Sequence, residues 1–275
     1  MDSLKSKVNQ AFIIAHQEST HKLEACLKQE GFHPKVLKQV HKREYNDYSQ
    51  SYLCLLNHCN AWQHILTTNE PALICEADFV PVENFGNLPA PWDTSSPDVG
   101  LAWLYTCAPQ IYSVPAPDYA VGFSTSLVAY VLMPAGAQYL LKIAELVKQV
   151  PGPTRYCAWD STIEWHLREH NLECYLPWRN YGEHGGKPNP EHKRAGLNRV
   201  HRADVLSGRL AFTPLYAAAD KYPAVHIILS RMMARIRGIG RLLLGRYLRP
   251  EVLSGSNYRS DMLKFAITRQ LTLRL

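Results

Sequence analysis

The chain has 275 residues, of which 46% are hydrophobic and 20% are charged. This composition is typical of a globular protein and excludes an intrinsically disordered one. The formal net charge is +6, and the surplus of basic over acidic residues within 222–275 is larger than that total. The rest of the chain is therefore close to neutral, and the basic charge belongs to the C-terminal part.

The first 80 residues alternate between strand-like and helix-like hydrophobic patterns. Buried strands are expected at 11–16, 35–40 and 71–80, with helices at 19–31 and 49–70 between them. Strands that alternate with helices in this way predict an α/β protein with a largely parallel sheet and helices on both of its faces.

The middle of the chain is less regular. Residues 86–126 are rich in Pro, Ser and aromatic residues, which predicts long irregular loops, and such loops are often functional. A buried strand is expected at 126–133, followed by a helix at 134–150 that begins with a proline. A further helix is expected at 157–171, and the segment 175–196, dense in Gly, Pro and His, is expected to be a loop.

The C-terminal part, 221–275, predicts a basic amphipathic extension that follows a domain over residues 1–220. On a helical wheel its arginines between 225 and 249 fall on one arc, and the other arc is apolar: Leu229, Met232, Met233, Ile236, Ile239, Leu243, Leu244 and Tyr247. This pattern is typical of a helix that lies in an anionic membrane surface. The alternative is a helix whose apolar face packs on its own domain. Nucleic acid is not an expected partner, because no stacking aromatics are interleaved with the arginines.

The seven cysteines are scattered and include no Cys-x-x-Cys pair, which indicates reduced thiols in a cytosolic protein. The apolar stretch at 11–15 is too short for the core of a signal peptide, and no segment approaches the roughly 20 apolar residues of a spanning helix. We therefore expect a cytoplasmic protein that associates peripherally with the inner face of the plasma membrane.

Two carboxylates end the apolar run at 71–75: Glu76 and Asp78. In an open parallel sheet, ligands bind beyond the carboxyl ends of the strands, and a spacing of two places both side chains on the same side. Carboxylate oxygens at such an edge suit Mg²⁺ or Mn²⁺ shared with the phosphates of a substrate. The alternative is a pair of solvated residues that open a loop.

The segment 55–82 resembles the central part of glycosyltransferase family 25, the lipooligosaccharide and procollagen galactosyltransferases. Asn57-His58-Cys59-Asn60-Ala61-Trp62 matches the Ser-His-x-x-x-Trp helix of that family with Asn57 in place of Ser, and Glu76-Ala77-Asp78 matches its acidic motif with Glu in place of the first Asp. The segments 126–141 and 156–167 resemble later landmarks. The resemblance extends over about residues 10 to 180, although the first strand lacks the usual Asn-Leu-Asp-Arg run.

This resemblance implies a GT-A type, Rossmann-like mixed sheet with helices on both faces. It implies a hexosyltransferase that moves a sugar from a nucleotide-sugar donor, UDP-linked in our expectation, to a glycan or glycolipid acceptor with inversion, in bacterial surface polysaccharide or lipopolysaccharide biosynthesis. Asp78, with Glu76, would hold Mn²⁺ or Mg²⁺, which stabilises charge on the leaving diphosphate. The alternatives are a catalytically inactive nucleotide-sugar-binding protein and a membrane-associated interaction protein on the same fold.

The resemblance also suggests further site residues. Asp160 matches the position of the general base, with Glu164 one helical turn later as its rival; Asp160 also fits a first-turn residue that only stabilises its helix. His184 is expected as a further metal ligand, with His192 as its rival and a plain surface loop as the alternative.

The donor-binding residues expected from the resemblance are His16, Asn57, His58, Ala77 and Arg202. His58 also fits a buried helix residue that holds the acidic strand in place. Arg194, Arg199 and Arg202 are candidates for contact with the diphosphate, and the alternative for them is a solvated basic face.

Overall fold

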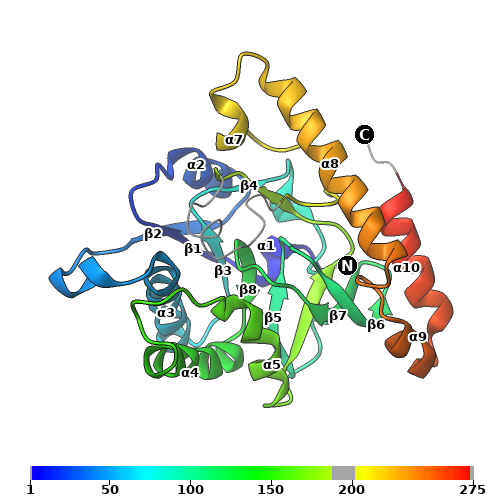
Figure 1. Ribbon diagram of the computed structural model, residues 1–275, viewed down its shortest axis with the longest axis horizontal. Helices are drawn as coiled ribbons and strands as arrows, with labels where there is room; N and C mark the ends of the chain where they lie inside the picture. Colours follow the sequence, from blue (N-terminus) through cyan, green and yellow to red (C-terminus); the bar gives the residue numbers. More distant parts are fainter. Residues whose placement is uncertain (1, 188–201, 273–275) are drawn as a thin grey trace.

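The computed structural model describes residues 2–187 and 202–272. Its centre is an eight-stranded mixed sheet in the order β2-β1-β3-β8-β5-β9-β7-β6, flanked by helices (Figure 1). The strands of this sheet are β1 (Gln10–Ala15), β2 (His33–Lys38), β3 (Ala72–Glu76), β5 (Val99–Trp103), β6 (Gln110–Ala116), β7 (Tyr119–Phe123), β8 (Ala129–Leu132) and β9 (Glu173–Pro177). A separate two-stranded sheet pairs β4 (Phe79–Pro81) with β10 (Gly182–His184). The predicted mixed α/β sheet with flanking helices is confirmed.

The strand directions set the position of the site. β1 runs parallel to β2 and to β3, whereas β8 is antiparallel to both β3 and β5. β3 and β5 therefore point the same way, and their carboxyl ends lie at one edge of the sheet with those of β1 and β2. β9 is parallel to β5 and ends at the same edge.

Helices cover both faces of the sheet (Figure 1). They are α1 (Leu4–Lys7), α2 (His21–Gln29), α3 (Gln50–Thr68), α4 (Pro134–Gln149), α5 (Ile163–Arg168), α7 (Leu215–Ala218), α8 (Pro223–Leu243), α9 (Pro250–Gly255) and α10 (Arg259–Leu271), with 3-10 turns at η1 (Arg43–Asp47), η2 (Phe85–Asn87) and η3 (Trp159–Thr162). Along β3, Ile74 packs in one hydrophobic core with Trp62 of α3, while Leu73 packs in the other core with Leu27 of α2. This alternation places the two cores on opposite faces.

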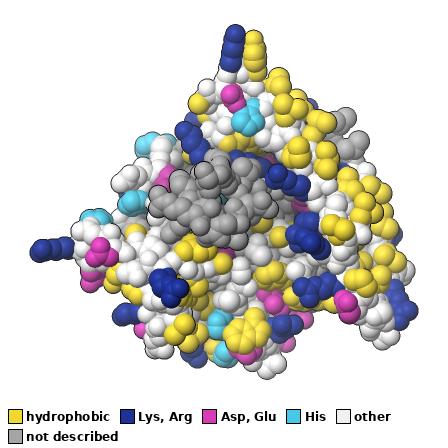
Figure 2. Space-filling view, in the orientation of Figure 1, with side chains coloured by type: hydrophobic (Ala, Val, Ile, Leu, Met, Phe, Trp, Pro, Cys, Tyr) yellow, Lys and Arg dark blue, Asp and Glu magenta, His cyan; other side chains and the backbone are white. Residues whose placement is uncertain are grey.

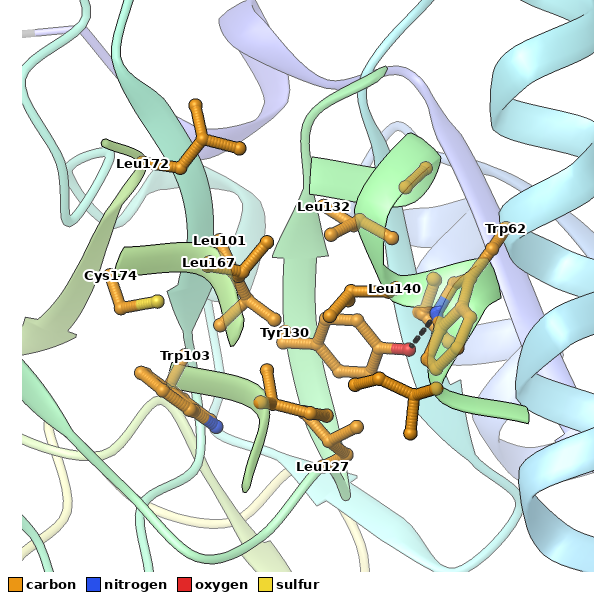
Figure 3. Packing of buried hydrophobic residues seen from close by; sticks show 14 of the residues in the cluster. Trp62, Leu101, Trp103, Leu127, Tyr130, Leu132, Leu140, Leu167, Leu172 and Cys174 are labelled. Carbon is orange, nitrogen blue, oxygen red and sulfur yellow. Dashed lines mark hydrogen bonds between the residues drawn. The ribbon is translucent and has the colours of Figure 1, made fainter. Parts of the chain in front are cut away.

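The core on the α3 side also contains a polar bond. The indole N–H of Trp62 donates to the hydroxyl oxygen of Tyr130 on β8 over 2.8 Å (Figure 3). Both side chains are fully buried, and the bond satisfies two polar groups that would otherwise destabilise the core.

The sequence-based prediction was wrong in the middle of the chain. Residues 86–126 were expected to be irregular but contain β5, β6 and β7, and the expected loop at 175–196 contains the end of β9 and all of β10. β5 is buried along its whole length, so its apolar run is real, and the surrounding Pro and Ser residues obscured it. The expected helix at 157–171 is a 3-10 turn followed by the short α5.

The helix expected over 225–249 is also shorter than predicted. α8 ends at Leu243, and the chain turns at Gly245, whose φ of +63° lies in the left-handed region that glycine adopts without strain. Tyr247, expected on the exposed apolar arc, is buried in the core on the α3 side, as is Leu248. Within residues 2–187 and 202–272, no helix has both the length and the apolar run needed to cross a membrane.

The apolar face of α8 points away from the protein, and several of its arginines point toward it. Its apolar side chains point outward and form a yellow stripe along the right of Figure 2, with exposed fractions between 51% and 59% for Val225, Ile228, Leu229, Met232, Met233 and Ile236. Arg231, Arg235 and Arg241 instead make hydrogen bonds to the rest of the protein. The alternative in which the apolar face packs on its own domain therefore holds for Tyr247 but not for the apolar side chains between 225 and 236.

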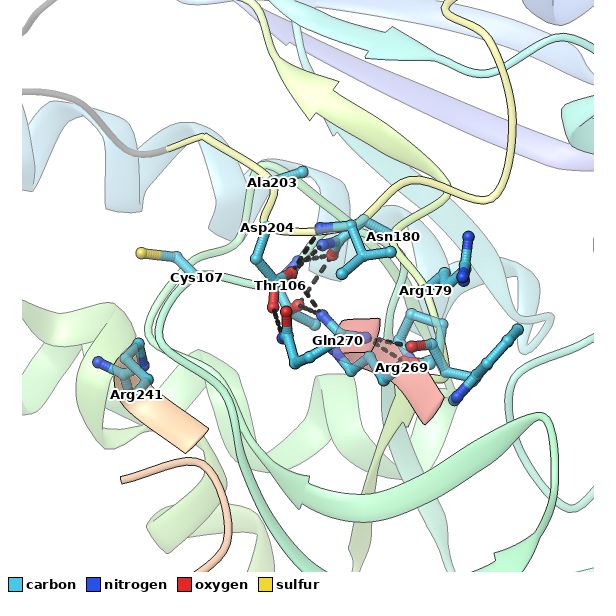
Figure 4. A network of polar contacts seen from close by, with 12 residues as sticks. Thr106, Cys107, Arg179, Asn180, Ala203, Asp204, Arg241, Arg269 and Gln270 are labelled. Carbon is cyan, nitrogen blue, oxygen red and sulfur yellow. Dashed lines mark hydrogen bonds and ion pairs between the residues drawn. The ribbon is translucent and has the colours of Figure 1, made fainter. Parts of the chain in front are cut away.

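The C-terminal part is joined to the central sheet by a polar network (Figure 4). The buried Arg269 of α10 donates to the carboxylate of Asp204 over 2.7 Å and to the carbonyl oxygens of Pro177 and Trp178. Asp204 also accepts from Asn180. The division of the chain at residue 220 stays a prediction, but the two parts share one core and one buried network.

Candidate active site

The candidate site lies where β3 ends. Glu76 is the last residue of β3, Asp78 lies in the turn before β4, and His184 is the last residue of β10, paired with Phe79 of β4. One carboxylate oxygen from each acid and one ring nitrogen of His184 lie within 4.8 Å of one another. The strand expected over 71–80 is broken at Ala77 and Asp78, so the turn and the β4–β10 pairing bring these groups together, not a strand period of two.

Asp78 and His184 form the closest pair in this cluster, with 3.1 Å between Oδ2 and Nε2. Burial disfavours charge on both groups, but each stabilises the charged form of the other. The pKa of His184 is raised to about 9, and the pKa of Asp78 is lowered from its usual value. Without a bound cation, the two residues therefore form an ion pair near neutral pH.

Two glycines follow His184 and let the backbone approach the cluster. A Cβ atom on Gly186 would lie 2.0 Å from Oδ2 of Asp78 and 3.0 Å from Nε2 of His184. The N–H of Gly185 donates to the carbonyl oxygen of Asp78 over 2.8 Å. Position 186 therefore accommodates no side chain without displacing Asp78.

Arg202 holds this segment in place. Its guanidinium donates to the carbonyl oxygens of His184 over 2.6 Å and of Gly186 over 2.9 Å, and it stacks over the ring of Tyr216 at 3.8 Å. The sequence predicts Arg202 as a donor-binding residue; in the structure its hydrogen bonds position the segment that carries His184.

His58 lies behind Glu76 and is fully buried, as one of the two interpretations expected. Tyr130 accepts the N–H of Trp62, so its own hydroxyl hydrogen is available to donate to Nδ1 of His58, 2.8 Å away. We therefore assign the proton of His58 to Nε2, which faces Oε1 of Glu76 at 3.7 Å. The N–H of the imidazole therefore points toward the carboxylate of Glu76 at a distance longer than a hydrogen bond.

Asp160, in η3, is close enough to the cluster for the charge of Glu76 to act on it. Burial, and then the negative charge of Glu76, raise the pKa of its carboxyl group to about 7. Glu164 is buried elsewhere: it pairs with Arg168 at 3.2 Å and bonds to Tyr112, and neither partner belongs to the cluster. Of the two candidate bases, the structure brings only Asp160 into the field of Glu76.

The remaining predicted donor-binding residues have different surroundings. His16 is exposed just beyond β1, and its backbone N–H donates to Glu18 over 2.7 Å. The N–H of Ala77 donates to the carbonyl oxygen of Ile14, which fixes the turn. Asn57 is buried, and its amide donates to the carbonyl oxygens of Ala15 and Leu37, so in this structure it joins α3 to the ends of β1 and β2. His192, Arg194 and Arg199 lie outside the described residues.

Three further residues at the site were not singled out from the sequence. Tyr105 is fully buried with its ring 6.1 Å from that of His184, and Glu183 is a buried carboxylate next to His184 in the chain. Cys54 has its sulfur within 4.8 Å of ligand atoms of His58 and Glu76. Burial, and then the Glu76 carboxylate, raise the pKa of the Cys54 thiol, so without a bound cation it stays protonated. The spacing of four between Cys54 and His58, which places both on one face of a helix, is the signal that could have indicated it.

The residues of the cluster fit a hard divalent cation. Among the described residues, Oδ1 of Asp78 is buried without a hydrogen-bond partner, while Oδ2 of the same carboxylate faces Nε2 of His184. Two carboxylates and one imidazole form a donor set that suits Mn²⁺ or Mg²⁺. Glu76, Asp78 and His184 would hold the ion.

A scan of protein families gives no match to this chain, and neither does a search of curated proteins. Solved structures with partial similarity include a glycosyltransferase involved in the glycosylation of the major capsid of PBCV-1, with a TM-score of 0.40 and 10% identity over 57% of this chain and 75% of that one.

Two others are structures of Drosophila β1,4-galactosyltransferase 7. A mutant in complex with manganese, UDP-Gal and xylobiose gives a TM-score of 0.36 and 12% identity over 68% of this chain and 74% of that one. The catalytic domain with xylobiose gives a TM-score of 0.32 and 14% identity over 62% and 65%.

Proposed function

We propose that this protein is an inverting, metal-assisted glycosyltransferase of the GT-A type that uses a nucleotide-sugar donor, UDP-linked in our expectation. The observation that carries the proposal is that a candidate cation site and a candidate general base occur together at the end of β3. A cation-binding set of Glu76, Asp78 and His184 lies within electrostatic range of Asp160, a carboxyl group with a pKa of about 7. A group that titrates near neutral pH is suited to general base catalysis.

Asp160 would act on the acceptor. An acceptor hydroxyl oxygen bonds to the anomeric carbon while the bond from that carbon to the diphosphate oxygen breaks, and the hydroxyl proton passes to a carboxylate oxygen of Asp160. When bound, the divalent cation supplies positive charge for the diphosphate that leaves. Arg202 and the close backbone of Gly186 keep His184 and Asp78 in place for this.

The resemblance to family 25 extends the proposal to a hexose donor and to a glycan or glycolipid acceptor in bacterial surface polysaccharide or lipopolysaccharide biosynthesis. The exposed face of α8 supports a location at an anionic membrane surface on the cytoplasmic side. Arg237 is exposed beside the apolar side chains, and Arg249 is exposed beyond the helix end. Apolar side chains flanked by cations bind the interface of an anionic bilayer.

A thermal-shift screen of nucleotide sugars tests the function, with Mn²⁺ in one series and EDTA in the other. A donor at 100 times its Kd stabilises the folded state by about 2.7 kcal/mol, which corresponds to a rise in Tm of about 5–10 °C for a domain of this size. We expect one nucleotide class to produce this shift only with Mn²⁺, and to be turned over.

Asp78→Asn removes the charge and keeps the shape, so it should abolish the Mn²⁺-dependent shift. Asp98→Asn, at an exposed aspartate outside the site, is the matched control. If no nucleotide diphosphate stabilises the protein with Mn²⁺, or if Asp78→Asn behaves like Asp98→Asn, the proposed function is wrong.

A further inference from the structure

A cavity with three arginines in its walls lies beside the end of α8. It has a volume of about 370 Å³, within the range of small-molecule sites. Its walls come from the segment before β6, from the end of β7 and the residues after it, and from the turn that follows α8: Ala108, Gln110, Phe123, Thr125, Arg241, Gly245, Arg246 and Arg249.

The charge of this cavity is not balanced within the protein. Three of its eight lining residues are arginines and none is acidic. In the part of the chain that the structure describes, the arginines paired with carboxylates are Arg168, Arg231 and Arg269, none of which lines the cavity. Three like charges around one cavity repel each other, and a bound anion would remove that cost.

Arg241 is held in a fixed orientation at the wall. Its Nη2 donates to the carbonyl oxygen of Ala108 over 2.9 Å, and its Nε is buried without a partner among the described residues. Ala108 itself has a φ of +49°; the other non-glycine residues with positive φ in the described chain are all asparagines, which tolerate it better. An alanine in this conformation indicates a backbone held under strain at the cavity, as occurs at ligand sites.

The cavity is close to the candidate active site. Thr125 lines it, and three residues later the carbonyl oxygen of Val128 accepts the N–H of Glu76 over 2.8 Å. A chain of three residues spans at most about 11 Å. Cys107 directly precedes Ala108 of the cavity wall, and the charges of both Asp160 and Arg241 act on the pKa of its thiol. Figure 4 shows Cys107 and Arg241 on the same side of the Asp204 network.

Apolar side chains continue from the rim of this cavity. Leu243 and Leu244 directly precede Gly245 and are 81% and 70% exposed. They extend the outward apolar face of α8 up to the three arginines. A ligand that spans both surfaces would have a phosphate group at one end and an apolar chain at the other.

We infer that this cavity binds the phosphate or diphosphate ester group of the acceptor, within reach of Asp160. That the bound ester belongs to the acceptor rests on the proposed function, whereas the anion site itself rests on the three arginines and the cavity. Planar guanidinium groups bind phosphate oxygens in pairs, which suits three arginines around one group. The ester is either that of a soluble sugar phosphate or that of a membrane lipid, and the two sources are separable by experiment.

The first measurement is calorimetric titration with inorganic pyrophosphate in EDTA, which leaves the cation-binding cluster without metal. The test variant carries Arg246→Gln and Arg249→Gln, and the control is Arg43→Gln with Arg259→Gln, which removes the same charge from exposed positions outside the cavity and outside the apolar face of α8. Each charge-assisted hydrogen bond lost should weaken binding about tenfold. Equal binding by test and control variants, or no binding by the wild type, would overturn the inference.

The second measurement uses phosphatidylcholine vesicles that contain either phosphatidic acid, a phosphate monoester, or phosphatidylglycerol, a diester. Loss of the phosphatidic acid preference in the test variant alone assigns the site to a lipid phosphate. Binding of pyrophosphate without any such preference assigns it to a soluble ester. If the wild type is inactive with every donor and the test variant still loses pyrophosphate binding, the anion site is confirmed and the proposed function is wrong.

Discussion

Arg231 of α8 and Glu183 of β10 form an ion pair with 2.8 Å between Nη1 and Oε2, and the side chain of Glu183 is 0% exposed. The other oxygen of Glu183 accepts the N–H of Ala203 over 2.7 Å. Glu183 directly precedes His184, so a residue of the C-terminal part anchors the strand that carries a candidate metal ligand. Deletion of residues 221–275 would therefore damage the site as well as remove α8.

Arg231→Ala leaves a carboxylate buried without its cation. We expect the free energy of unfolding to fall by about 3–5 kcal/mol, the cost of breaking a buried pair from one side. Urea denaturation measures this, and Arg237→Ala on the exposed surface should change the value by less than about 0.5 kcal/mol. The double variant Glu183→Gln with Arg231→Met removes both charges and should recover part of the loss. An unchanged midpoint in the single variant would contradict the anchoring role.

Gly186→Ala should remove metal-dependent donor binding, because the added Cβ meets the Asp78 carboxylate at 2.0 Å. Gly240→Ala is the matched control, since a Cβ there meets nothing within 4 Å. In the last turn of α8 that change should stabilise the protein by up to about 0.5–1 kcal/mol. The measurements are Mn²⁺ affinity and thermal unfolding for both variants. Wild-type Mn²⁺ affinity in Gly186→Ala would show that the ion binds elsewhere.

Asp160 must be deprotonated to act as a base. With a pKa of about 7, kcat/KM should fall about tenfold per pH unit below that value and level off above it. Asp160→Asn should lower turnover by about 10²–10⁴ and leave donor binding intact. Glu164→Gln is the control because its partners are outside the cluster. The base assignment fails if Glu164→Gln loses the activity and Asp160→Asn retains it.

The raised pKa of Asp160 also makes a prediction that needs no substrate. The folded state holds this proton more tightly than the unfolded state, so the free energy of unfolding decreases as pH rises from the ordinary value of 3.8 to about 7. Asp160→Asn lacks that decrease. Urea midpoints should show the variant more stable than the wild type at pH 8, with a smaller difference at pH 5. Identical midpoints at pH 8 would mean that the carboxyl group is not held in a perturbed environment.

The outward face of α8 is tested with a triple variant, Leu229→Gln with Met232→Gln and Ile236→Gln. All three side chains are more than half exposed, so we expect wild-type stability but loss of binding to anionic liposomes in a flotation assay. The control, Leu146→Gln with Val150→Gln, changes exposed apolar residues at the end of α4. Binding that survives in the triple variant, or a wild type that ignores liposomes and sediments as a dimer, would assign this face to another partner.

The parts of the site that could be predicted are those that depend on residues close together in the sequence. The apolar run before Glu76, the helix around His58 and the position of Asp160 are all set by nearby residues. The pairing of Glu183 with Arg231 joins residues 48 apart, and nothing in either segment alone indicates the partner. The orientation of α8 was equally hidden: a helical wheel separates the apolar face from the basic face, but only tertiary packing decides which one points to the protein.

The position of Arg269 has a consequence for synthesis of the protein. This arginine is 1% exposed and bonds to the backbone of Trp178, which is 91 residues earlier in the chain. Ribosomes add about 5–20 residues per second, so the segment between β9 and β10 waits on the order of 5–20 seconds for this anchor. During that interval the nascent chain exposes the apolar surface that Tyr247 and Phe265 later cover. We therefore expect folding to finish only after translation of α10, with a chaperone holding the partly folded chain until then.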